Sequence, residues 1–156
     1  MADLTVTLTE AVTLNGGSRG STNTLTISGV DDVYHRIVTC PASADTTVAT
    51  FQAASSTADG ALDLQETKYI RVTNMDASNP VNLSLQVSND EDGAADYSSS
   101  ILLEAGKSFL MGTPHDGIQV SDANANVITT LVDLESIIAD PAGNDVKVEV
   151  FIASVV

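Results

Sequence analysis

Apolar and polar side chains alternate along most of this chain, and the segment Lys68–Ser88 shows the alternation most clearly. Every second residue from Val81 to Val87 is apolar, and the residues between them are polar. Side chains on a β-strand point alternately to opposite faces, so this pattern predicts a strand with one buried face and one wet face. The preceding segment, Tyr69–Thr73, alternates in the same way, and a polar stretch, Asn74–Pro80, separates the two. We therefore predict a β-hairpin over Lys68–Ser88.

Similar apolar patterns recur in other segments, which we also predict to be strands. They are Leu4–Leu14, Leu25–Ile27, Val33–Cys40, Thr46–Phe51, Ile101–Leu103, Ser108–Met111, Ile118–Val120, Val127–Leu134 and Val146–Ile152. The fifth and sixth of these flank a short polar turn and form a second candidate hairpin. Leu131–Ala139 also matches helical spacing, so one short helical turn is an alternative there. Short strands without intervening helices predict a single all-β domain over residues 1–156, an antiparallel β-sandwich or jelly-roll barrel with little or no helix.

The charge of the chain argues against two classes of partner. Acidic residues outnumber basic ones by 21 to 6, which gives a net charge of −15. Nucleic-acid binding needs lysine and arginine to displace counterions from phosphates, and anionic membranes attract the same residues. We therefore expect neither nucleic acid nor a membrane as a partner. Aromatic residues make up only 4% of the chain, which is poor material for stacking against sugars.

The single cysteine and the N-terminal segment indicate a chain that folds in a reducing compartment. Cys40 has no second cysteine with which to form an intrachain disulfide, and it precedes Pro41 at a predicted strand end. We interpret it as a small packed hydrophobic residue. The N-terminal residues enter a strand pattern directly, without the basic and apolar regions of a signal peptide, so we expect synthesis and folding in a cytosol.

Motifs that carry catalysis or bind cofactors are not found. His35 and His115 are the only two histidines, and neither lies in a metal-binding spacing such as HExxH. Gly16–Gly20 is glycine-rich but lacks the lysine of a phosphate-binding loop and precedes a strand rather than a helix. We predict that the protein is not an enzyme and has no catalytic residue, cofactor or metal.

An acidic turn, Asp90–Asp96, resembles a calcium-binding loop in composition. If Gly93 were the invariant glycine of an EF-hand, the first and twelfth ligand positions would be Ser88 and Ser99, which lack carboxylates. We interpret the segment as a solvated acidic turn, with a looser calcium site as the alternative.

The two terminal strands suggest an assembly surface. Both are long and regular, and the chain ends on the apolar segment Ala153–Val156, although free chain ends are usually polar. An uncovered apolar strand promotes aggregation, so we expect it to be covered, either by a strand of the same molecule or by a neighbouring subunit. The residues of this predicted assembly edge are Leu4, Val6, Leu8, Val148, Val150 and Ile152.

The segments Tyr69–Ser88 and Ser100–Met111 carry a resemblance to a known class. Their phrases, YIRVTNMDASNPVNLSLQVS and SILLEAGKSFLM, resemble those of decoration (cement) proteins and other minor virion proteins of tailed bacteriophages. The resemblance implies a non-enzymatic structural protein, made in the host cytoplasm, that binds the major capsid protein on the virion surface. It also implies a homo-oligomer, with a trimer favoured. A tail- or fibre-associated protein is the first alternative, and a glycan-binding or carboxylate-hydrolase β-module is the second.

Overall fold

The structure is a computed structural model that describes residues 1–52, 60–88, 97–120 and 127–156. Its described residues form β-strands and turns, without a helix. The strands are β1 (Ala2–Thr9), β2 (Thr13–Leu14), β3 (Gly17–Ser18), β4 (Thr22–Val30), β5 (Asp32–Cys40), β6 (Thr46–Gln52), β7 (Leu62–Asp63), β8 (Thr67–Asn74), β9 (Val81–Ser88), β10 (Tyr97–Leu103), β11 (Ser108–Met111), β12 (Asp133–Pro141) and β13 (Val146–Ser154).

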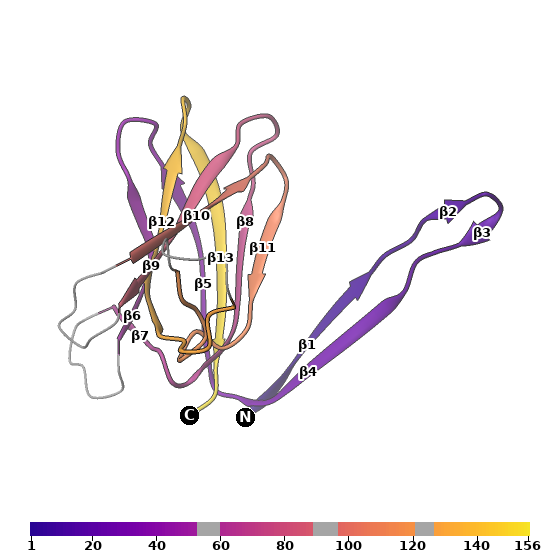
Figure 1. The fold of residues 1–156 in the computed structure, drawn as a ribbon, viewed down its shortest axis with the longest axis horizontal. Helices are drawn as coiled ribbons and strands as arrows, with labels where there is room; N and C mark the ends of the chain where they lie inside the picture. Colours follow the sequence, from indigo (N-terminus) through magenta and orange to yellow (C-terminus); the bar gives the residue numbers. More distant parts are fainter. Residues whose placement is uncertain (53–59, 89–96, 121–126) are drawn as a thin grey trace.

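Two sheets pack against each other to form the body of the molecule (Figure 1). One has the strand order β11-β8-β13-β5, and the other has the order β10-β9-β12-β6-β7. The chain changes sheet between β5 and β6, β7 and β8, β8 and β9, β10 and β11, β11 and β12, and β12 and β13. Apart from the short β7, this is the order of a jelly roll, a double sheet of eight strands. The prediction of an all-β antiparallel fold is therefore confirmed as a sandwich, and among the described strand pairs only the short β6–β7 pair is parallel.

The predicted hairpin over Lys68–Ser88 is wrong in its pairing, although both of its strands are present. β8 pairs with β11 and β13, whereas β9 pairs with β10 and β12, so the chain crosses between the sheets at Asn74–Pro80. The second predicted hairpin fails in the same way, because β10 and β11 also lie in different sheets. Alternation reports that one face of a strand is buried, but it does not identify the neighbouring strand.

Two further strand predictions need correction. Ile118–Val120 forms no strand, and Ile118 makes only an isolated bridge to Val132. The strand predicted at Val127–Leu134 begins instead at Asp133 and continues to Pro141. The helical alternative at Leu131–Ala139 is not adopted, because β12 pairs there with both β6 and β9.

The inward-facing side chains of β13 form the centre of the core. Val146, Val148, Val150 and Ile152 are each 1% exposed or less. They pack in one cluster with buried residues of the opposite sheet such as Leu83. Complete burial of each such side chain is worth about 1.5–3 kcal/mol, so this row contributes much of the driving force for folding.

Residues 2–30 form a long β-hairpin, here called the arm, that stands away from the body (Figure 1). β1 and β4 pair with each other along their length, and β2 and β3 continue the ribbon to its tip. Asn15 and Gly16 make the tip turn, with φ angles of 52° and 76°. Positive φ at both central residues is the requirement of a type I′ turn, which explains the Asn-Gly sequence.

A buried asparagine holds the crossing between β8 and β9. The side-chain amide nitrogen of Asn74 donates to the backbone oxygens of Asn79 at 2.8 Å and Leu103 at 3.1 Å. Its side-chain oxygen accepts the backbone N–H of Asp76 at 2.9 Å. The Asp76 carboxylate in turn accepts the backbone N–H groups of Ser78 and Asn79, and these hydrogen bonds lower the pKa of Asp76. The polar stretch that separates the two strands is therefore an ordered turn.

We predict that Asn74→Ala lowers the free energy of unfolding by at least about 1–3 kcal/mol, because the buried Leu103 carbonyl loses its side-chain donor. Urea denaturation would measure the change. The matched control is Asn144→Ala, since exposed Asn144 also donates to the same turn, at the side chain of Asn79. We expect that control to change stability by no more than about 0.5 kcal/mol. Equal losses in the two variants would contradict a special role for Asn74.

Candidate functional site

The arm has two chemically different faces. One face carries three cross-strand pairs of threonine, Thr5 with Thr26, Thr7 with Thr24, and Thr9 with Thr22. The other face carries the pairs Leu4 with Ile27, Val6 with Leu25, and Leu8 with Asn23. Threonine and branched aliphatic residues favour extended backbone, which explains why this segment forms a ribbon. The result is a ribbon with a hydroxyl face and an apolar face.

The root of the apolar face packs on the outer surface of the β11-β8-β13-β5 sheet. Leu4, Val6 and Ile27 contact a small cluster that includes Tyr69 of β8 and Phe151 of β13. The two aromatic rings meet edge to face, with centroids 6.2 Å apart. This cluster is separate from the main core and attaches the arm to the body.

Farther from the root, the arm exposes large apolar side chains. Leu8 is 54% exposed and Leu14 is 59% exposed, and Val12 and Leu25 are also about half exposed. Successive residues in an antiparallel strand advance about 3.4 Å, so Leu14 lies roughly 20 Å beyond Leu8 along an extended ribbon. An isolated two-stranded hairpin is only marginally stable in water.

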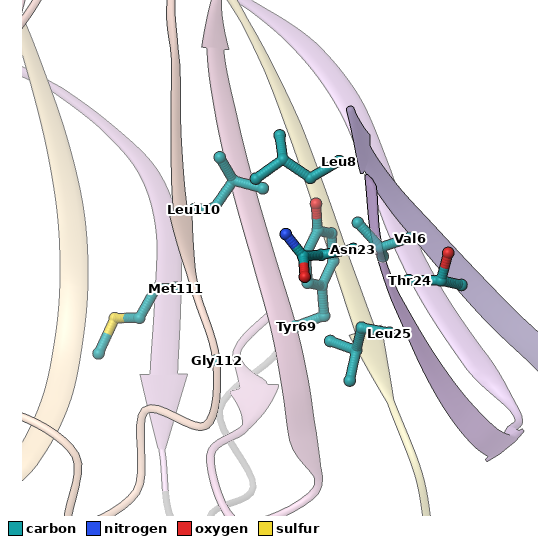
Figure 2. Close-up of a pocket in the computed structure, with 9 residues that line it drawn as sticks. All are labelled: Val6, Leu8, Asn23, Thr24, Leu25, Tyr69, Leu110, Met111 and Gly112. Carbon is teal, nitrogen blue, oxygen red and sulfur yellow. The ribbon is translucent and has the colours of Figure 1, made fainter. Parts of the chain in front are cut away.

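An open apolar cavity of about 350 Å³ lies between the arm and the sheet, and we call it the wedge. Its arm side includes Val6, Leu8 and Leu25, and its sheet side includes Tyr69 and Leu110. Figure 2 shows the three arm side chains pointing toward Tyr69 and Leu110, whereas the neighbouring threonine of β4 points away. The wedge therefore offers apolar walls on both sides.

A charged network lies on the same sheet face beside the wedge. The Glu149 carboxylate accepts a hydrogen bond from Arg71 at 2.6 Å, and its other oxygen lies 2.8 Å from Nε2 of His35. Arg71 also lies over the ring of Phe151, at 5.9 Å from its centroid. The hydrogen bond from Arg71 and, second, that from His35 lower the pKa of Glu149. Three neighbouring strands, β5, β8 and β13, are joined across their outer face by this network.

We predict that the network makes stability depend on pH below neutrality. Because the folded-state pKa of Glu149 is lowered, its contribution is fully present above the unfolded value of about 4.3 and is lost as pH falls through the folded value. The stability of the wild type should therefore fall more steeply between about pH 5 and pH 3 than that of Glu149→Gln. Thermal melts over this range would measure the difference.

The control for this experiment is Glu104→Gln, a change at an exposed carboxylate between β10 and β11. That variant should retain the wild-type pH dependence. If Glu149→Gln also retained it, the network would not contribute to stability.

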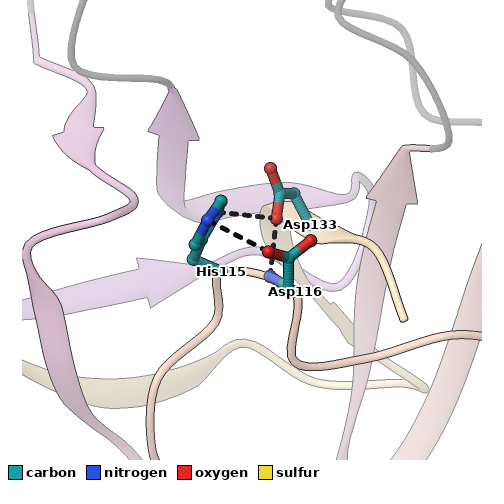
Figure 3. Close-up of side chains that lie close together, drawn as sticks. All are labelled: His115, Asp116 and Asp133. Carbon is teal, nitrogen blue, oxygen red and sulfur yellow. Dashed lines mark hydrogen bonds and ion pairs between the residues drawn. The ribbon is translucent and has the colours of Figure 1, made fainter. Parts of the chain in front are cut away.

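A second cluster of titratable groups brings together His115, Asp116 and Asp133 (Figure 3). His115 Nε2 lies 3.1 Å from a carboxylate oxygen of Asp116, and Nδ1 lies 3.0 Å from Oδ1 of Asp133. The second contact is close but is not aligned as a hydrogen bond, which leaves the buried Nδ1 atom without one. The same Oδ1 atom accepts the backbone N–H of Asp116 at 2.7 Å.

The cluster has ligand types that a transition metal could use, since one imidazole nitrogen and two carboxylate oxygens lie within 4.8 Å of one another. However, the two ring nitrogens face different carboxylates, and one metal ion takes only one nitrogen of an imidazole. The arrangement therefore fits a histidine ring held between two carboxylates better than a preformed metal site. Its structural effect is to hold the loop after Pro114 against the start of β12.

We predict that Asp133→Ala releases this loop, because the Asp116 amide loses its 2.7 Å acceptor. Amide hydrogen exchange at Asp116 should become faster by roughly a factor of ten for each 1.4 kcal/mol of lost local stability. Asp140→Ala, an exposed change on the same strand, is the control and should leave this exchange unchanged. Unchanged exchange in Asp133→Ala would contradict the assignment.

The residues of the predicted assembly edge do not lie together. Leu4, Val6 and Leu8 are on the arm, on its apolar face. The other three, Val148, Val150 and Ile152, lie in the core on a central strand with a neighbour on each side, so they are not part of an edge. Of the two ways of covering the last strand that we considered, the structure has the intramolecular one.

Other residues singled out in the sequence are placed as follows. Cys40 ends β5 and is fully buried, as predicted, and burial raises the pKa of its thiol. The glycine-rich segment Gly16–Gly20 lies at the arm tip rather than at a phosphate site. The acidic turn Asp90–Asp96 lies outside the described residues.

The sequence analysis missed Tyr69 and Phe151 as the seat of the arm. Both occupy positions where the alternation predicts an exposed, polar side chain, each next to a buried residue such as Ile70 or Val150. An aromatic residue in that phase indicates that the supposedly wet face is covered. This signal was present in the sequence.

Comparison of the chain with protein-family models, with characterised proteins and with solved structures gives no match. The described residues contain no helix that is long and apolar enough to cross a membrane. These comparisons therefore add no argument for function.

Proposed function

We propose that this protein is a non-enzymatic structural component of a tailed-bacteriophage virion, a decoration protein that binds the major capsid protein and stabilises the shell. The observation that carries the assembly role is the arm, and the β5 edge described below is the proposed contact with the shell. Residues 2–30 lie outside the core and expose large apolar side chains such as Leu8 and Leu14. Exposed apolar surface of this kind marks sites of protein–protein contact.

Two further observations support the capsid as the setting. The jelly roll is a common architecture of viral capsid domains, although it also occurs in lectins, and a fold alone does not define a function. The resemblance of Tyr69–Ser88 and Ser100–Met111 to decoration proteins and other minor virion proteins supports a virion component. A strongly acidic surface would keep decorated particles soluble.

The edge strand β5 supplies a contact for the shell. It is nine residues long, and in the described chain only one of its sides pairs with another strand, β13. Val33 and Ile37 on its outer face are 46% and 57% exposed. A strand of a capsid subunit can add to such an edge through backbone hydrogen bonds, and the apolar side chains add specificity. Many such contacts on one shell sum by avidity.

We predict that the protein co-sediments with undecorated capsids of its virion at a fixed stoichiometry and raises their melting temperature. Ile37→Glu should weaken this binding by roughly tenfold or more, since loss of a buried isoleucine costs about 1.5–3 kcal/mol. The matched control is Thr39→Glu, because Thr39 is also exposed on β5 but is not apolar. We expect this variant to lose less capsid affinity than Ile37→Glu. Absence of co-sedimentation by the wild type would refute the proposed function.

A further inference from the structure

We propose that the partner of the arm is a second copy of this chain, whose wedge receives the outer part of the arm. This inference extends the proposed function. It rests on that function only because both treat the arm as an assembly element. It assigns the arm to contacts between copies and leaves the β5 edge for the shell.

Charge is the first argument for a second copy. The arm carries one basic residue, Arg19, against two acidic ones, Asp3 and Glu10, so its net charge is −1. The remaining residues carry five basic against 19 acidic side chains, a net charge of −14. The arm is thus nearly neutral, so the strongly acidic body of another copy repels it only weakly.

The arm tip strengthens this argument. Arg19 is exposed beside the tip turn, and within the described part of the chain no carboxylate lies within ion-pairing distance of it. An unpaired cation at the end of a nearly neutral ribbon is complementary to an acidic protein surface. A nucleic acid would also attract Arg19, but the body would repel it.

Apolar complementarity is the second argument. Each copy presents an outer arm with exposed Val12 and Leu14, and a wedge whose walls include Leu8, Tyr69 and Leu110. Copies related by a closed rotation can each insert an arm into the wedge of the next copy, so every exposed apolar row and every wedge is used once.

The hydroxyl face of the arm, here called the Thr face, allows the proposed contact through the apolar face to be tested against a contact through the opposite face. The pairs Thr7 with Thr24 and Thr5 with Thr26 alternate with the apolar pairs along the ribbon, and Figure 2 shows the Thr24 side chain pointing away from Tyr69. In the proposed arrangement the apolar face carries the contact between copies, and the Thr face does not. Substitutions at adjacent residues of β1, such as Thr7 and Leu8, are therefore expected to have very different effects on self-association.

Sedimentation velocity of the full chain, without capsids, tests the proposal. The wild type should form a closed oligomer, a dimer or a trimer, at micromolar concentration. Leu8→Glu should weaken self-association by roughly tenfold or more, because it places a charge in the apolar contact. Thr7→Glu introduces the same charge one residue away on the opposite face and should associate as the wild type does. A monomeric wild type, or equal effects of the two substitutions, would overturn the proposal.

A crosslinking experiment keeps the test valid if Leu8→Glu disturbs the arm itself. A photoreactive phenylalanine analogue at Leu14 is introduced into the full chain, and copies labelled with ¹⁴N and ¹⁵N are mixed. Crosslinks should join the two isotopes and map to peptides containing Tyr69 or Leu110. Crosslinks confined to one isotope, or no crosslinks, would overturn the proposal. Because neither experiment contains capsids, failure here is distinct from failure to bind a shell.

Discussion

The burial of one face of β13 is the interaction on which the rest of the structure depends. Its alternate residues from Val146 to Ile152 lie in the core, and its backbone pairs with β5 on one side and β8 on the other. Removing this strand would separate the sheet into two parts and expose the opposite row, which includes Leu83 and Ile137. The outward side of the same strand carries Phe151 and Glu149, so the strand that closes the core also provides the seat for the arm.

The arm is an element that would be only marginally stable by itself. A two-stranded ribbon has little hydrophobic driving force in water, and the cluster around Tyr69 and Phe151 anchors only its root. The outer half keeps Leu8 and Leu14 exposed while its opposite face is lined with threonine. This division fits an element whose remaining stability comes from another chain, because association adds the missing apolar burial.

Much of the strand content could be predicted because alternation is a local property. The buried and partly exposed residues of β9 follow the predicted phase from Val81 to Val87, and the Asn15–Gly16 turn occurs where its sequence indicates. The hairpins at Lys68–Ser88 and Ile101–Met111 were mispredicted, because a strand that crosses to the other sheet buries the same face as a strand that pairs with its neighbour. The candidate site was predictable in part, since Leu4, Val6 and Leu8 were identified, but their separation from β13 was not.

The sequence by itself determined the all-β class, the phase of the main strands, the acidic charge and the burial of Cys40, because these depend on residue type and short-range order. Only the tertiary structure decided that consecutive strands lie in opposite sheets, that β13 is central, and that residues 2–30 leave the body as an arm. Each of these depends on contacts between residues far apart in the chain. Local alternation is equally compatible with several such pairings, and the packing of the whole core selects one.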